Sequence, residues 1–309
     1  MNHPSTLPTP SFVNASGEIP YNMTNDYMFR AVLQKNKKVL AGLVGSLLHL
    51  DPETLDVEIA NPIILGESID DKTFVLDVEV TVNRNTHLDL EMQVINYGNW
   101  KERSLSYLCR SFDSLTRGAN YIDLPPAAHI GFIDFSLFED APEFYATYKM
   151  QNVKNHRIYT DKMWLSVVEL NSIELATEED RLYRIDQWAK LFKAKTWEEL
   201  KAMATTNQYM ESAANTMYEL SADRMVKEQC RRRAEYERFQ KYQAEENARK
   251  DALIADQKAV IADQKAVIAG KDALITDQKA VIKDKDTVIA DQKAVIEDLK
   301  RMLADVHRK

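Results

Sequence analysis

A strict seven-residue repeat constrains the fold of this chain more than any other feature of the sequence. Residues 254–309 form eight consecutive blocks of seven, and the block IADQKAV occurs three times. Such a repeat keeps one stripe of a helix apolar and is typical of a coiled coil. We therefore expect a long C-terminal helix over 221–309, opened by Ser221, in place of a second globular domain.

Of the two core columns of this repeat, one is apolar and the other is mostly polar. Its first column consists of Ile254, Ile261, Ile268, Ile275, Ile282, Ile289, Ile296 and Leu303. The column three residues further on consists of Gln257, Gln264, Lys271, Gln278, Lys285, Gln292, Leu299 and Val306. Polar residues in a core column lower stability and help to set register and strand number. We expect the chain to self-associate through this segment, and a solvated single helix stays open as the alternative.

Several protein classes lack their signatures in this sequence. The only cysteines are Cys109 and Cys230, and the six histidines are scattered, so we expect neither disulfides nor a zinc site. The motifs GxGxxG, GxxxxGK[ST] and GxSxG do not occur. No run of eighteen apolar residues is present, so the sequence predicts no membrane segment and a cytoplasmic protein.

The charge distribution argues against a constitutive nucleic-acid binder. The formal net charge is -8, and residues 1–221 carry 20 Lys and Arg against 31 Asp and Glu. Nonspecific affinity for phosphates comes from clustered positive charge. The part of the chain that we expect to fold is therefore strongly acidic.

The pattern upstream of the repeat predicts a layered domain over 19–220. Residues 1–18, with three prolines and few apolar residues, are expected to be disordered. Helices are expected from Thr24 or Asn25, over 39–50, and over 99–117 with Leu105 and Leu108 facing inward. Strands are expected over 129–135 and 164–170, and helices from 177 onward, with a capping box at Thr196. This order indicates an α/β fold with a mixed sheet flanked by helices.

Residues 74–94 alternate between apolar and polar positions and predict a hairpin. The alternation breaks at residues 83–85, and a three-residue loop that pairs Val82 with Thr86 keeps both apolar sets on one face. The same register sets Asp77 opposite Glu91. The opposite face then carries four carboxylates and an amide, from Asp77, Glu79, Asp89, Glu91 and Gln93. Such a face is either exposed to water or binds a divalent cation, and Mg²⁺ needs only one or two carboxylates.

An ordered set of segments resembles a known family. NDYMFRAVL, DDKTFVLDVEV, LEMQV, WKERSLSYLCRSF, GANYIDLPP and IGFIDFSLF, in that order over about residues 20–220, are similar to the recombination-promoting nuclease and transposase family. This family belongs to the PD-(D/E)xK nuclease superfamily, in which Asp77 and the Glu91-x-Gln93 pair correspond to a D…ExQ form of the motif. The resemblance implies a restriction-endonuclease-like sheet.

The resemblance also implies a set of site residues. Asp77 and Glu91 would bind Mg²⁺, Asp26 would complete the metal shell, and Gln93 would orient the attacking water as the third catalytic residue. Gln93 stands where the superfamily commonly has lysine, so positive charge is missing there. Arg103 would hold a phosphate, and Arg110 is a second candidate for DNA contact. An ordinary first-turn position for Asp26 that stabilises the helix dipole, and exposed surface positions for the arginines, stay open as alternatives.

Two functions from different classes follow from this sequence. The first is a Mg²⁺-dependent DNA endonuclease linked to recombination or transposition, with self-association through the coiled coil. The second is a catalytically inactive nuclease-fold protein that works as a binding or assembly module through the same coiled coil. The acidity of residues 1–221 favours the second, and the presence of Asp77, Glu91 and Gln93 favours the first.

Overall fold

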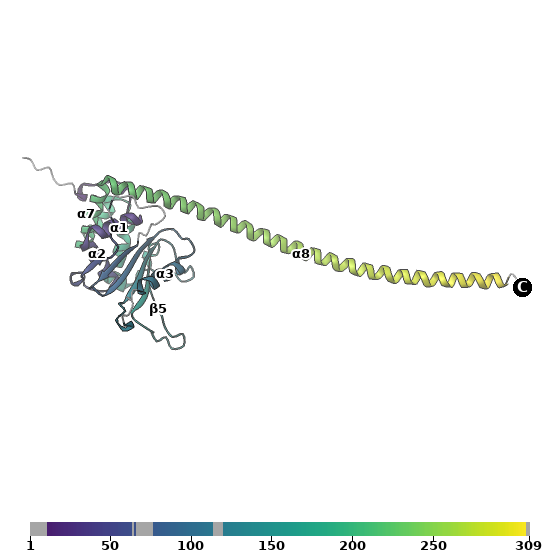
Figure 1. Ribbon diagram of the computed structural model, residues 1–309. Coiled ribbons are helices and arrows are strands. Elements are labelled where there is room, and N and C mark those ends of the chain that lie inside the picture. The colour runs from purple at the N-terminus through teal and green to yellow at the C-terminus, as the bar shows by residue number, and fades with distance from the viewer. Residues whose placement is uncertain (1–10, 64, 66–76, 114–119, 307–309) are drawn as a thin grey trace, which may run out of the picture. The chain divides into compact units, whose positions relative to one another are not determined.

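The computed structural model describes residues 11–63, 65, 77–113 and 120–306. Within this part of the chain, strands form a six-stranded sheet in the order β1-β2-β3-β4-β6-β5 (Figure 1). β3, β4 and β6 are parallel to one another, whereas β1, β2 and β5 run antiparallel to their neighbours. The strands are β1 (Val57–Ile59), β2 (Val78–Val82), β3 (Thr86–Gln93), β4 (Ala127–Ile133), β5 (Tyr145–Lys149) and β6 (Met163–Glu169).

The helices precede and follow the sheet in the chain, as predicted. They are α1 (Asp26–Lys35), α2 (Lys37–Leu48), α3 (Trp100–Phe112), α4 (Glu178–Leu182), α5 (Ile185–Lys193), α6 (Trp197–Ala204), α7 (Gln208–Ala222) and α8 (Arg224–Val306). Asn25 caps α1, because its side chain accepts the N–H of Met28 at 3.2 Å. Thr196 and Glu199 form the predicted capping box of α6. The predicted mixed sheet flanked by helices is thereby confirmed.

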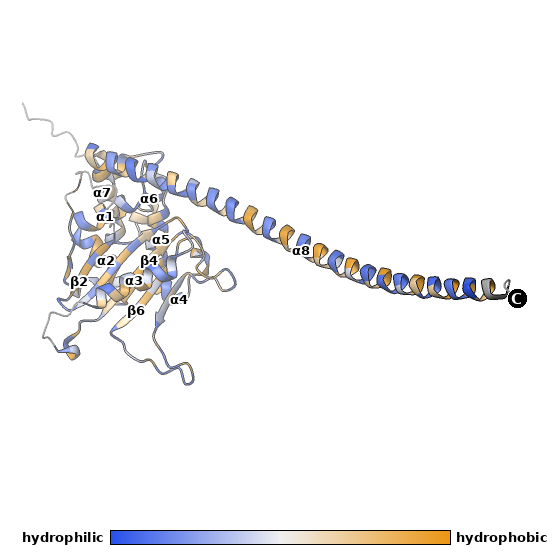
Figure 2. Cartoon of the chain, turned by 45° about the vertical axis from the view of Figure 1, so that its right-hand side comes forward, coloured by the Kyte–Doolittle hydropathy of each residue, from blue (hydrophilic) through white to orange (hydrophobic). Residues whose placement is uncertain are grey.

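The two faces of the sheet are covered differently. Even-numbered residues of β3 and β4 join the large core, where Phe29 of α1, Phe132 of β4 and Phe192 of α5 pack with ring centroids 5.2 to 5.5 Å apart. The opposite face carries a small cluster of Trp100, Ile133 and Val167 beneath α3. Apolar colouring in Figure 2 follows the central strands between these layers. α3 therefore covers the sheet face that carries the odd-numbered residues of β3.

Residues 11–18 differ from the predicted disorder. Phe12 is buried in the large core, the N–H of Gly17 donates to the carboxylate of Glu198, and the N–H of Ile19 donates to the Lys195 carbonyl at 2.8 Å. Few apolar residues precede Ile19, but one aromatic side chain and main-chain hydrogen bonds are enough to fix this segment. Residues 1–10 lie outside the described residues.

Two other expectations need correction, and two strands were not predicted. Leu105 is 51% exposed, because α3 turns Trp100, Ser104 and Leu108 toward the sheet instead. α8 begins at Arg224 and not at Ser221, since the side chain of Asp223 accepts the N–H groups of Met225 and Val226 and starts a new helix. β1 and β5 were not predicted: β1 is only three residues long, and β5 is an edge strand with little burial. The predicted start of the hairpin at Phe74 and the predicted end of the helix at Arg117 lie outside the described residues.

The chain divides into two compact units, Met1–Lys241 and Tyr242–Lys309. The first unit extends past the predicted boundary at residue 220, because the start of α8 contributes the buried side chains of Val226 and Cys230 to its core. In the second unit, taken by itself, the isoleucines of the repeat are about half exposed, from 47% at Ile254 to 58% at Ile282. Among the described residues, no helix is both long and apolar enough to cross a membrane.

Candidate active site

The hairpin of β2 and β3 has the predicted register. Val82 pairs with Thr86 across residues 83–85, and Asn83 and Arg84 take up positive φ angles of 50° and 56°. The last ladder pair joins Val78 to Leu90, so the pair that would follow in this register is Asp77 with Glu91. The alternation of the sequence therefore places the acidic side chains on one face.

This acidic face is buried and not solvated. Asp77, Asp89, Glu91 and Gln93 are between 1% and 7% exposed, whereas Glu79 is exposed. The alternative of a water-exposed acidic face is thus wrong for four of these five residues. Carboxylates are seldom buried unless they are paired or bind a metal, because desolvation disfavours their charge.

A pocket of 380 Å³ brings most of the predicted site residues together. It is lined by Asp77, Glu91 and Gln93 from the hairpin, by Asp26 from α1 and by Arg103 from α3. These residues come from elements that the sequence separates by up to 77 positions. The hairpin and the helices α1 and α3 of the first unit thus converge on the acidic face.

Arg110 is the one predicted site residue that the structure places elsewhere. It lines a neighbouring pocket of 290 Å³ together with Glu79, Asp89 and Tyr107, and Asp77 lines both pockets. About two helical turns separate Arg110 from Arg103 on α3, and the guanidinium of Arg110 lies 5.5 Å from the ring centroid of Tyr107. A direct role beside Glu91 and Gln93 is therefore not supported by its position.

Glu91 is held by one arginine and keeps one oxygen without a partner. Arg103 Nη2 lies 2.5 Å from Glu91 Oε1, while Glu91 Oε2 is buried and has no hydrogen-bond partner. Burial raises the pKa of Glu91, and the nearby Arg103 guanidinium opposes that rise. The unpartnered oxygen is consistent with a cation-binding role.

Asp77 is fixed through its backbone. Its carbonyl accepts hydrogen bonds from the buried guanidinium of Arg30 and from Asn61 Nδ2. Burial raises the pKa of the Asp77 carboxyl to about 6, and the neighbouring Asp89 carboxyl adds to the rise. Burial likewise raises the pKa of Asp89 to about 7. Crowded carboxyl groups of this kind gain stability when a cation neutralises them.

Asp26 repeats the arrangement of Glu91 on the other side of the pocket. Arg233 of α8 contacts Asp26 Oδ2 through Nη2 at 2.5 Å and through Nε at 2.6 Å, and Asp26 Oδ1 is buried without a partner. Burial raises the pKa of Asp26, opposed by Arg233. Asp26 lies in the first turn of α1 but also lines the pocket, so stabilisation of the helix dipole alone does not account for its position.

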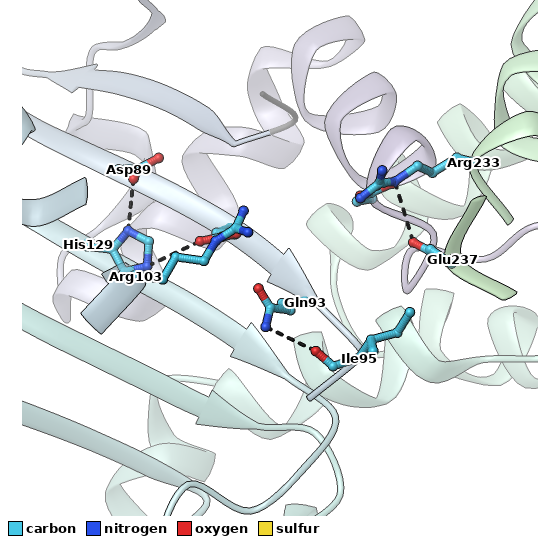
Figure 3. A network of polar contacts seen from close by, with 9 residues as sticks. Asp89, Gln93, Ile95, Arg103, His129, Arg233 and Glu237 are labelled. Atoms are coloured by element: carbon cyan, nitrogen blue, oxygen red, sulfur yellow. Dashed lines mark hydrogen bonds and ion pairs between the residues drawn. The ribbon is translucent and has the colours of Figure 1, made fainter. Parts of the chain in front are cut away.

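Gln93 is oriented by its own strand end. Its Nε2 donates to the carbonyl of Ile95 at 3.0 Å (Figure 3). This bond uses one of the two N–H donors of the amide, and the amide oxygen can only accept. Gln93 can therefore orient a water molecule but supplies no positive charge to the pocket.

Sequence reasoning missed His129 of β4, which connects two of the acids. Its Nδ1 is hydrogen-bonded to Asp89 Oδ2 at 2.8 Å, and its Nε2 lies 3.6 Å from Glu91 Oε2 (Figure 3). Burial lowers the pKa of His129 to about 4, so the ring is neutral at neutral pH. Its only signal in the sequence is a histidine within the otherwise apolar strand AAHIGFI. His129 is a positioning residue that holds the Asp89 side chain through Nδ1 and places its other ring nitrogen beside Glu91.

The start of α8 was also missed. Arg233, Tyr236, Glu237 and Gln240, which recur at helical spacing, line the pocket opposite the hairpin. Burial raises the pKa of Glu237 to about 8, and repulsion from Asp26 adds to the rise. No pattern in the sequence assigns these residues to the domain, since they lie in the helical segment upstream of the repeat.

The pocket residues offer buried carboxylate oxygens that could bind a divalent cation. Asp26 Oδ1 and Glu91 Oε2 are buried oxygens without partners, and Asp77 lines the same pocket. Among the described residues, no three His, Cys, Asp or Glu side chains are already grouped as a metal site. Hard oxygen ligands and a small number of carboxylates suit Mg²⁺, which keeps several waters when bound.

A mixed sheet with paired acidic strands and a covering helix defines a PD-(D/E)xK nuclease-like fold. The family of PD-(D/E)XK nuclease family transposases matches residues 23–252, and the chain belongs to this family. The match covers the pocket residues from Asp26 to Gln240. No curated protein and no solved structure matches the chain.

Proposed function

We propose that this chain is a metal-dependent endonuclease that hydrolyses phosphodiester bonds of DNA. The proposal is carried by the convergence of Asp26, Asp77, Glu91 and Gln93 on one pocket of a PD-(D/E)XK family fold. Its family description as a transposase supports a link to DNA recombination or transposition. Plasmid nicking in the presence of Mg²⁺, and its loss on chelation, tests the proposal.

Each pocket residue would take one task. Asp77 and Glu91 would hold Mg²⁺, with Asp26 as a third oxygen ligand, and Gln93 would accept a hydrogen bond from the attacking water. Bound Mg²⁺ supplies Lewis-acid polarisation of the phosphate and lowers the pKa of a coordinated water. Arg103, already 36% exposed at its side chain, can turn from Glu91 to a phosphate and hold it through two N–H donors.

Metal affinity is expected to depend on pH through Asp77. Its pKa of about 6 in the folded chain means that protons compete with the metal below that pH. We expect the dissociation constant for Mg²⁺ to rise by about fivefold from pH 6 to pH 5 and to level off above pH 7. Calorimetric titration of the full chain with MgCl₂ measures this. An affinity that stays constant over this range would contradict a metal ligand at Asp77.

The repeat of α8 is proposed to self-associate. About half of each isoleucine in its first column is exposed when the second unit is taken by itself, and coiled-coil pairing removes such apolar surface from water. The oligomer would hold two or more nuclease domains together. An inactive assembly protein would use the same repeat, so cleavage assays decide between the two candidates.

Truncation after Gln243 is expected to leave a folded domain of smaller oligomeric mass. The cut keeps the whole first unit, including the α8 residues that line the pocket, and removes the repeat. Light scattering measures the mass, and tryptophan fluorescence measures folding because all four tryptophans lie between residues 100 and 197. Equal subunit numbers before and after truncation would show that the repeat does not assemble the chain.

A further inference from the structure

The candidate pocket has an unusual charge balance. Its described lining residues include four acids, Asp26, Asp77, Glu91 and Glu237, and two cations, Arg103 and Arg233. None of these lining residues is a lysine. Phosphodiester hydrolysis develops negative charge at the phosphate, and fixed positive groups stabilise it. With glutamine at position 93, one of the two arginines must supply any positive charge that comes from a side chain.

Arg233 is the better oriented of the two arginines. Two of its nitrogens contact Asp26 Oδ2, and its guanidinium carbon lies 4.9 Å from the ring centroid of Tyr236. Its side chain is 16% exposed, against 36% for Arg103. A guanidinium held in this way loses less conformational freedom when it binds an anion.

The partner of Arg233 is itself one of the proposed metal ligands. Both contacts go to Oδ2 of Asp26, and Oδ1 has no partner. A cation shared by Asp26 Oδ1 and the acidic face would take over part of the neutralisation of Asp26. The positive charge of Arg233 would then be available to a phosphate that enters the same pocket.

The beginning of α8 is also the basic part of an otherwise acidic unit. Residues 224–241 carry seven Lys and Arg against three Asp and Glu, whereas residues 1–221 carry 20 against 31. A polyanion is therefore attracted to the first unit most strongly along this segment. In the view of Figure 3, Gln93 lies between Arg103 and the pair of Arg233 and Glu237.

We propose that Arg233 of α8 contacts a backbone phosphate of the nucleic acid in the pocket and supplies the positive charge that Gln93 lacks. This inference rests on the proposed nuclease function and adds a substrate-binding residue to it. It makes the start of α8 a part of the active site, although the sequence continues from it directly into the repeat.

The experiment measures the salt dependence of DNA binding. A fluorescein-labelled, phosphorothioate-linked duplex, which keeps its charge and resists hydrolysis, is titrated with the full chain in MgCl₂ at several KCl concentrations. The Arg233→Gln variant is compared with Arg238→Gln, which makes the same change of charge on the same helix outside the pocket. Each lost phosphate contact reduces the slope of log K against log salt by about 0.9.

We expect Arg233→Gln to reduce the slope by about 0.9 and Arg238→Gln to leave it unchanged. An unchanged slope for Arg233→Gln, or an equal reduction for both variants, overturns the assignment. A purely structural ion pair with Asp26 would alter thermal stability but not the slope. Arg233→Lys serves as the second variant, and it decides the question if Arg233→Gln does not fold.

Arg233→Lys keeps the charge but not the two-nitrogen fork. We expect it to keep the wild-type slope and to reduce kcat for plasmid nicking by about tenfold, the scale of a lost charged hydrogen bond. An unchanged kcat overturns the proposal. If the wild-type chain does not cleave but Arg233→Gln still reduces the slope, the nuclease function fails and the phosphate contact stands. If the wild type cleaves and Arg233→Gln changes nothing, only this inference fails.

Discussion

Asp77→Asn and Glu91→Gln are each expected to reduce Mg²⁺-dependent nicking of supercoiled plasmid by at least ~10³-fold. Loss of a carboxylate ligand would remove the proposed cation, and a metal ion's electrostatic stabilisation of a transition state is worth several kcal/mol. The measurement is the initial rate of conversion from supercoiled to nicked plasmid. Glu79→Gln is the matched control, because Glu79 lies on β2 two residues after Asp77 but is exposed and lines only the neighbouring pocket.

The two variants are expected to differ in stability. The folded pKa of Asp77 is raised, so its ionised form costs stability above about pH 6, and Asp77→Asn removes that cost. Glu91→Gln instead deprives the half-buried Arg103 of its ionised partner and should lower Tm. Both should remain folded by tryptophan fluorescence at 25 °C. Full activity in either folded variant would exclude the proposed metal site, and activity lost equally in Glu79→Gln would point away from the pocket.

Gly131→Ala is expected to destabilise the first unit by about 3 kcal/mol, the upper end of overpacking effects. Gly131 pairs with Glu91 in the sheet, and a Cβ atom there would overlap the six-membered ring of the buried Trp100. The ring belongs to α3, which would have to move off the acidic face. A loss of this size lowers Tm by roughly 6 to 12 °C in a unit of this length.

Tryptophan fluorescence is the suitable readout for this melt, because α8 dominates any helical signal of the whole chain. Gly270→Ala is the control, since nothing lies within 4 Å of a Cβ at that position. Combining Gly131→Ala with Trp100→Leu should cost less than the sum of the two single changes, because the smaller side chain makes room. A Tm within 2 °C of the wild type for Gly131→Ala would show that α3 does not rest on Gly131.

The local features of the site follow from the sequence. Alternation over 78–93 specifies which side chains share a face, and the three-residue loop specifies the register, so Asp77, Glu91 and Gln93 could be brought together without coordinates. Capping by Asn25 and Thr196 is equally local. Such features depend on neighbours a few positions apart, whose geometry the backbone fixes.

Only the tertiary structure decided what lies over the acidic face and what completes the pocket. The two-residue alternation of the strands predicts that the carboxylates share a face. It does not predict that α3 buries them by packing Trp100 against Gly131. Asp26 and Arg233 meet across 207 positions, and His129 reaches Asp89 across 40. Contacts between residues so far apart in the sequence produce no periodic sequence pattern, because they arise from the packing of whole helices and strands. Sequence alone determined the paired acids, and packing decided that they are buried beside arginines.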